Sequence, residues 1–137
     1  MIVLDEQLQG LGLEHAVSRW YRGAVVVVTT LRPGTVVKDE AIPTLLRRCK
    51  QPIFVTINHT DFWRRIPADR SYCIVCLALT IEQAAQVGDW LRRLCRLPEF
   101  KTKRTRMGKV VLLSQWRLQY YHIHATPITT LRWLTAE

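Results

Sequence analysis

Apolar runs separated by amphipathic or turn-rich stretches dominate the hydrophobic pattern of this chain. Short, continuous apolar runs rich in Val and Ile are typical of strands that are buried on both faces of a sheet. We expect such strands at residues 2–4, 24–29, 51–57, 72–79 and 109–113. Residues 116–123 follow closely enough to pair with the fifth strand as a hairpin.

Stretches with helical spacing of apolar residues lie between these strands. They predict helices over residues 6–21, from Asp39 to about residue 48, over 81–97, and a short final one over 127–136. Gly10 and Gly12 weaken the first of these, Asp39 is a candidate N-cap of the second, and Thr80 is a candidate cap of the third. Strands that alternate with helices indicate an α/β layered domain with right-handed crossovers.

The size of the chain favours one domain. A chain of 137 residues that is 48% hydrophobic can bury a core of its own. No apolar run approaches the roughly 20 residues that a membrane span needs, and we expect a soluble cytoplasmic protein without a membrane partner. The four cysteines include Cys73 and Cys76, which are three apart on a predicted strand and should point to opposite faces. We therefore expect buried thiols rather than a metal or redox site.

Positive charge is concentrated in the second part of the chain. The net charge is +9, of which residues 1–61 contribute +1 and residues 62–137 contribute +8. A cationic surface of this kind suits a polyanion, and RNA is the partner that we expect. Phe62 and Trp63 could stack on bases, although core packing is the commoner role of such aromatics.

Acidic residues follow the predicted strands at one end. Asp5 and Glu6 follow the first strand, Asp39 and Glu40 begin the helix after the second, and Asn58 and Asp61 follow the third. Since carboxyl ends of parallel strands share one edge of a sheet, these groups should meet there. Clustered carboxylates repel each other unless a cation lies between them, and oxygen ligands suit Mg²⁺ or Mn²⁺. Each acid also has a plain structural alternative, as a helix cap or a turn residue.

The same residues carry a resemblance to a known family. The segments Asp5-Glu-Gln-Leu, Asp39-Glu-Ala-Ile and Val55-Thr-Ile-Asn-His-Thr-Asp-Phe62, in this order, resemble the signatures of a prokaryotic PIN-like family related to VapC-type toxin nucleases. The resemblance covers about residues 1–123, with residues 124–137 as a C-terminal extension. It implies a three-layer α/β/α fold with a mostly parallel sheet and a C-terminal hairpin.

The resemblance also implies an activity, a metal-dependent endoribonuclease that could be the toxin of a toxin–antitoxin pair. Asp5, Asp39 and Asp61 would then be the catalytic, metal-binding acids, with Glu6, Glu40 and Asn58 as further ligands. One position departs from the family pattern: Asn58 stands where an Asp is expected, and one extra residue separates it from Asp61. Asparagine adds no negative charge, so the metal affinity should fall.

Basic residues are the candidates for binding the phosphates of a substrate, because Lys and Arg hold phosphate oxygens without reading sequence. They form two groups in the chain: Arg64, Arg65 and Arg70, then Lys101, Lys103, Arg104 and Arg106.

Three functional alternatives stay open from the sequence. The first is the nuclease, with an antitoxin or a second copy of the chain as protein partner. The second is a catalytically degenerate PIN-like domain that binds RNA or a protein. The third is a receiver-like signalling domain, which is disfavoured because Ile57 or Asn58 occupies the place of the phospho-acceptor Asp.

Overall fold

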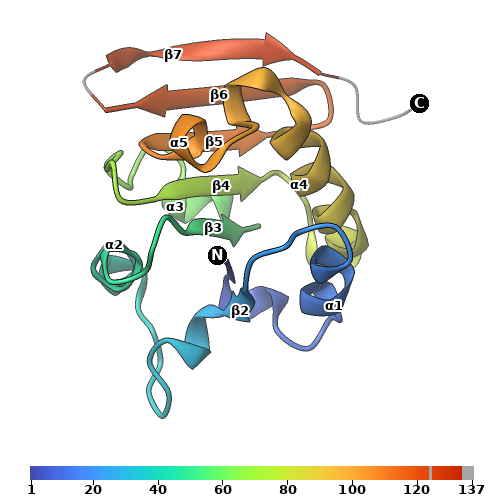
Figure 1. The fold of residues 1–137 in the computed structure, drawn as a ribbon, viewed down its shortest axis with the longest axis vertical. Helices are drawn as coiled ribbons and strands as arrows, with labels where there is room; N and C mark the ends of the chain where they lie inside the picture. Colours follow the sequence, from blue (N-terminus) through green and yellow to red (C-terminus); the bar gives the residue numbers. More distant parts are fainter. Residues whose placement is uncertain (124, 134–137) are drawn as a thin grey trace.

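The computed structural model describes residues 1–123 and 125–133 as an α/β fold built on one seven-stranded sheet (Figure 1). The strand order is β2-β1-β3-β4-β5-β6-β7. The first five strands of this order run parallel to one another, and β6 and β7 are antiparallel additions beyond β5. The strands are β1 (Ile2–Leu4), β2 (Val25–Val27), β3 (Ile53–Thr56), β4 (Cys73–Leu77), β5 (Lys109–Leu113), β6 (Arg117–His122) and β7 (Ala125–Arg132). The predicted α/β class, mostly parallel sheet and hairpin after β5 are confirmed.

Helices cover both faces of the parallel part of the sheet. On one face lie α1 (Leu13–Ser18) and α4 (Val87–Arg96), and on the other lie α2 (Ile42–Arg47) and α3 (His59–Phe62). Short strands alternate their side chains between these faces, as Ile2 and Leu4 pack with α1 and α4, whereas Val3 packs with α2. Cys73 and Cys76 lie in opposite cores, as their spacing predicts. No helix among the described residues is long and apolar enough to cross a membrane.

The first predicted helix is much shorter than expected. Glu6–Leu8 form a 3-10 turn, and the α-helix begins only at Leu13. The break falls at Gly10 and Gly12, which both adopt left-handed backbone conformations with φ of 77° and 73°. Glycine takes up this conformation without the steric cost that a side chain imposes, so the two glycines divide the segment.

The second predicted helix begins differently from its prediction. Asp39–Ala41 form a 3-10 turn that leads into α2, and the residue at the cap position is Lys38. Asp39 is therefore the first residue of this turn and not its N-cap. The third helix follows its prediction more closely. Thr80 and Gln83 form a reciprocal capping box, a 3-10 segment spans Ile81–Gln86, and α4 follows.

The predicted final helix is wrong over its described part. Residues Ala125–Arg132 form β7, which pairs antiparallel with β6. The β-branched run Ile128-Thr-Thr fits a strand that has a neighbour to pair with, and this tertiary pairing outweighs the helical spacing. Trp133, just after β7, is 7% exposed and packs edge-on against Trp90 of α4, with ring centroids 6.0 Å apart. Residues 134–136 of the predicted helix lie outside the described part of the chain.

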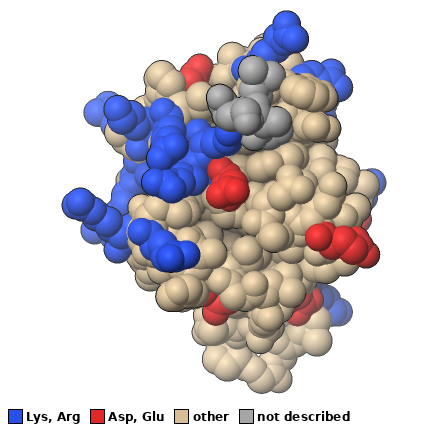
Figure 2. Space-filling model, turned by 90° about the vertical axis from the view of Figure 1, so that its right-hand side faces the viewer, with Lys and Arg blue, Asp and Glu red and all other residues tan. Residues whose placement is uncertain are grey.

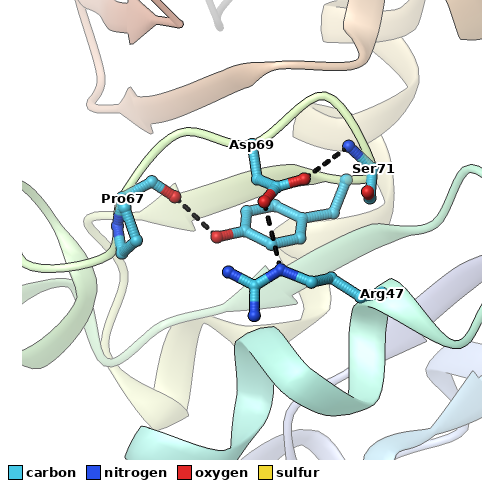
Figure 3. Close-up of polar contacts among 5 residues, drawn as sticks. Arg47, Pro67, Asp69 and Ser71 are labelled. Atoms are coloured by element: carbon cyan, nitrogen blue, oxygen red, sulfur yellow. Dashed lines mark hydrogen bonds and ion pairs between the residues drawn. The ribbon is translucent and has the colours of Figure 1, made fainter.

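A polar cluster fastens the loop before β4 to α2 (Figure 3). Arg47 forms an ion pair with Asp69, with 3.1 Å between Nε and Oδ2. The other carboxylate oxygen of Asp69 accepts a hydrogen bond from the backbone N–H of Ser71. The hydroxyl of Tyr72 donates to the carbonyl of Pro67 across the same loop. This loop leads into the first residue of β4. The cluster therefore stabilises the edge of the sheet at which the parallel strands begin (the amino edge), opposite the acidic residues.

Candidate functional site

Asp5 is the most constrained of the predicted site residues. It leaves β1 at the carboxyl edge of the sheet, and its backbone N–H donates to the carbonyl of Val55 in β3. Its side chain is 6% exposed and accepts two hydrogen bonds, from the backbone N–H of Glu6 at 2.9 Å and from the hydroxyl of Thr56 at 2.7 Å. The carboxylate is thus held in one orientation by its two neighbours in the fold.

Thr56 is a residue of this site to which the sequence analysis gave no role. It is fully buried at the end of β3, and its Oγ1 also accepts a hydrogen bond from the backbone N–H of Asn58 at 2.9 Å. One hydroxyl therefore fixes the Asp5 carboxylate and the path of the chain that leads to Asn58. The signal available in the sequence was a lone hydroxyl in the otherwise apolar strand Ile53–Thr56.

Electrostatic interactions connect the three acidic segments. Burial raises the pKa of Asp5, the hydrogen bonds from Thr56 and Glu6 partly oppose this, and the charges of Asp39 and Glu6 add to it. Burial also raises the pKa of Asp39, and next in importance are the charges of Asp61 and Glu40. Asp39 thus interacts with both Asp5 and Asp61, so the segments that follow β1, β2 and β3 lie within electrostatic range of each other.

The same carboxylates do not form a closed metal site. Among residues 1–123 and 125–133, no three or more His, Cys, Asp or Glu side chains are arranged to hold a metal ion. Asp39 and Asp61 are exposed, and Asp61 accepts a hydrogen bond from the Asn58 side-chain amide at 2.8 Å. The donor set consists of carboxylate and amide oxygens, so its chemistry suits a hard divalent cation. Metal binding by these residues stays a prediction.

The two groups of predicted phosphate-binding residues lie in different places. Arg64 and Arg65 are exposed and come just after α3 and its cap residue Trp63, in the segment that leaves the acidic edge. Arg70 precedes β4 and is at the amino edge. The second group, Lys101, Lys103, Arg104 and Arg106, belongs to the segment before β5, also at the amino edge.

One of the predicted phosphate-binding residues and one of the predicted base-stacking residues are buried. Arg106 is only 7% exposed, whereas the other three members of its group are exposed. Phe62 is fully buried against Phe54, with ring centroids 5.4 Å apart, and cannot stack on a base. Trp63 is half-buried against Tyr121.

Comparison with protein-family models, curated proteins and solved structures found no match to this chain. The PIN-like resemblance therefore rests on the three acidic motifs and their order, and function has to be argued from the site itself.

Proposed function

We propose that the protein is a PIN-like endoribonuclease that uses Mg²⁺ or Mn²⁺ bound at the acidic edge of the sheet. The observation that supports this most is the buried Asp5 carboxylate, which Thr56 and Glu6 hold in place within the field of Asp39. A fold gains no stability from burying a carboxylate beside other carboxylates. Such an arrangement is typical of a site that is built to bind a cation.

Each polar residue has a defined part in this proposal. Asp5, Asp39 and Asp61 would hold the metal, and Glu6, Glu40 and Asn58 would contribute further oxygen donors around it. When bound, the metal would activate water and stabilise the charge that develops on a phosphodiester during in-line attack. Thr56 keeps Asp5 oriented toward the edge of the sheet, and Arg64 and Arg65 would hold the phosphates of the RNA backbone.

A role as the toxin of a toxin–antitoxin pair is part of the proposal and derives from the family resemblance. A small DNA-binding protein encoded by a neighbouring reading frame, and an inhibitory complex between the two purified proteins, would support it. If no neighbouring product binds the chain, the toxin role fails while the nuclease proposal stands.

The decisive experiment measures RNA cleavage with Mn²⁺, with Mg²⁺ and with EDTA. We expect metal-dependent cleavage that Asp5→Asn reduces by at least about 100-fold, because the substitution removes the central ligand charge. Glu14→Gln in α1 is the matched control, since it removes one carboxylate that does not interact with Asp5 or Asp39. Equal activity of the Asp5→Asn variant and the Glu14→Gln control would refute the proposal.

A second candidate function is RNA binding without cleavage. Asn58 in place of an acid, and the absence of a three-ligand group in the described chain, favour it. This alternative predicts that metal neither binds nor promotes cleavage, and that Asp5→Asn leaves RNA affinity unchanged or improved. The same samples distinguish the two functions by a filter-binding or fluorescence-anisotropy measurement.

A further inference from the structure

A second polar site lies at the edge of the sheet opposite the acidic residues. It is a pocket of about 470 Å³ between α1, α4 and the segment that precedes β5. Figure 2 views the face that carries α1 and α4, and Lys and Arg side chains gather on one side of it. The residues that line the pocket are Trp20, Tyr21, Arg22, Arg92, Cys95, Arg96, Lys101 and Arg106. Five of these eight carry a positive charge, and none carries a negative charge.

Two of the residues that line the pocket show that it lies at the amino edge of the sheet. The Tyr21 hydroxyl accepts a hydrogen bond from the backbone nitrogen of Met1, which directly precedes β1. Arg106 lies three residues before Lys109, where β5 begins. Asp5 follows the opposite end of β1, so the pocket and the acidic site are separated by the length of the strand. A ligand in this pocket would not touch the predicted catalytic acids.

Arg106 is the residue that most requires an explanation. Its side chain is 7% exposed, its Nε donates to the carbonyl of Thr102, and one terminal nitrogen contacts Sγ of Cys95 at 3.3 Å. Both partners are neutral. Within residues 1–123 and 125–133, Arg106 forms no ion pair. Burying a charge without a counter-charge is costly, and a bound anion is one of the ordinary explanations of such a group.

The surrounding cations point to the same kind of ligand. Arg22, Arg92, Arg96 and Lys101 are exposed and come from three separate segments of the chain. Their convergence on a concave surface is electrostatically unfavourable until an anion lies between them. Guanidinium groups match phosphate oxygens in geometry and bind them through paired hydrogen bonds. Asp89 lines an adjoining cavity that shares Arg92 and Arg96, and it limits the positive field on that side.

The aromatic side chains and the volume of the pocket indicate a ligand larger than a single phosphate. Trp20 is half-buried and packs edge-on against Tyr21, with ring centroids 6.1 Å apart, so its indole is held in the pocket wall. Indole rings stack on nucleobases, whereas they contribute little to binding a lone inorganic phosphate. The volume lies within the range of about 300–1,000 Å³ that is usual for small-molecule sites, and so exceeds the need of a single phosphate.

We propose that this pocket binds a nucleotide, with its phosphate among Arg96, Lys101 and Arg106 and its base against Trp20. The nucleotide is either free or one unit of an RNA strand, since both present the same phosphate and base. Binding at this site needs no metal and is independent of the proposed cleavage.

Calorimetric titration of the full chain at low salt with AMP, adenosine and orthophosphate tests the proposal. We expect AMP to bind more tightly than either of its parts, with or without EDTA, and binding to weaken as salt is added. Arg96→Gln and Lys101→Gln should each weaken AMP binding by roughly tenfold, because each removes a charged phosphate contact. Both side chains are exposed, so neither change should unfold the protein. Arg32→Gln is the matched control: it removes the same charge from an exposed residue that is not part of this pocket.

Four results would overturn the proposal: no AMP binding, binding of adenosine or orthophosphate as tight as that of AMP, equal losses in Arg96→Gln and Arg32→Gln, or no loss in Trp20→Leu. A 5′-phosphorylated single-stranded RNA of ten nucleotides identifies the source of the nucleotide. Tighter binding of this RNA than of AMP, weakened by Arg96→Gln but not by Arg32→Gln, assigns the pocket to an RNA strand, and tighter binding of AMP assigns it to a free nucleotide. Asp5→Asn should leave AMP binding unchanged, so failure of the nuclease proposal and failure of this one give different results.

Discussion

Replacing Thr56 by Val tests whether one hydroxyl organises the acidic site. Val has nearly the same shape and volume, so the buried position at the end of β3 can accept it without a cavity. The change removes the hydrogen bond to the Asp5 carboxylate and the acceptor of the Asn58 N–H. The perturbation is therefore confined to the two polar contacts.

The expected cost follows from these two contacts. A hydrogen bond to an ionised group contributes about 1.5–3 kcal/mol, and the Asn58 N–H, which is half-buried, loses about 1 kcal/mol. The sum is about 2.5–4 kcal/mol at neutral pH, which for a chain of this length lowers Tm by about 10 °C. In the wild type, the hydrogen bond from Thr56 partly offsets the rise in the pKa of Asp5 that burial causes. Without this bond, the pKa of Asp5 should be higher still in the variant. The cost should then shrink as the pH falls and the carboxyl becomes protonated.

Urea denaturation of the wild type, Thr56→Val and Thr56→Ser at pH 7 and at pH 4 measures this cost. Ser keeps the hydroxyl and loses one buried methyl group, which costs about 1 kcal/mol. If Thr56→Val costs no more than Thr56→Ser at pH 7, the hydroxyl does not hold Asp5 and the reasoning fails. A cost that is the same at both pH values would show that the charge of Asp5 is not involved.

Three further predictions concern metal binding, the last strand and the loop before β4. Mn²⁺ affinity should rise as the pH passes the raised pKa values of Asp5 and Asp39, because the ionised carboxylates are the proposed ligands. Calorimetric titration with Mn²⁺ between pH 4 and pH 7 measures this, and an affinity that does not change with pH would contradict it. Trp133→Ala should lower the free energy of unfolding by about 3 kcal/mol, since it empties a packed site beside α4, whereas an effect below about 1 kcal/mol in urea denaturation would contradict that packing. Asp69→Asn should cost less than about 1 kcal/mol at pH 7. The Ser71 backbone N–H lowers the pKa of Asp69, so this cost should be fully present above pH 4 and decrease as the pH falls through the lowered pKa. A cost that does not change as the pH falls would contradict this cause.

Much of the sheet could be predicted from the sequence because its strands are short, continuous and apolar. Burial on both faces leaves such a run few alternatives, and each of the five parallel strands lies within its predicted range. The strand β2 is the exception in burial, because it is an edge strand whose Val25 and Val26 are only half-buried. The helices were harder, because their limits depend on local backbone conformations. Gly10 and Gly12 were recognised as weak points, but only the structure shows that both adopt left-handed conformations and end any helix there.

The strand β7 could not be predicted because its stability is tertiary. Local signals in residues 127–132 conflict, because the apolar spacing favours a helix and the β-branched residues favour a strand. Pairing with β6, together with the contact between Trp133 and Trp90, determines their conformation. The acidic site was predicted at the level of segments, since strand ends follow from strand positions. Its inner contact, from Thr56 to Asp5, joins residues 51 apart in the chain and is invisible to any local pattern.

The position of β1 has a consequence for how the molecule folds. This three-residue strand lies between β2 and β3, and Ile2 is aligned with Val25 on one side and with Ile53 on the other. Parallel pairing over such separations requires large loops to close before any hydrogen bond compensates for their entropy. We expect refolding from denaturant to be slow for a domain of this size, with the antiparallel neighbours β5, β6 and β7 structured early and the pairing of β1 with β3 formed late, because Ile2 and Ile53 are far apart in the chain. The acidic edge, which begins with β1, would then be among the last parts of the molecule to form.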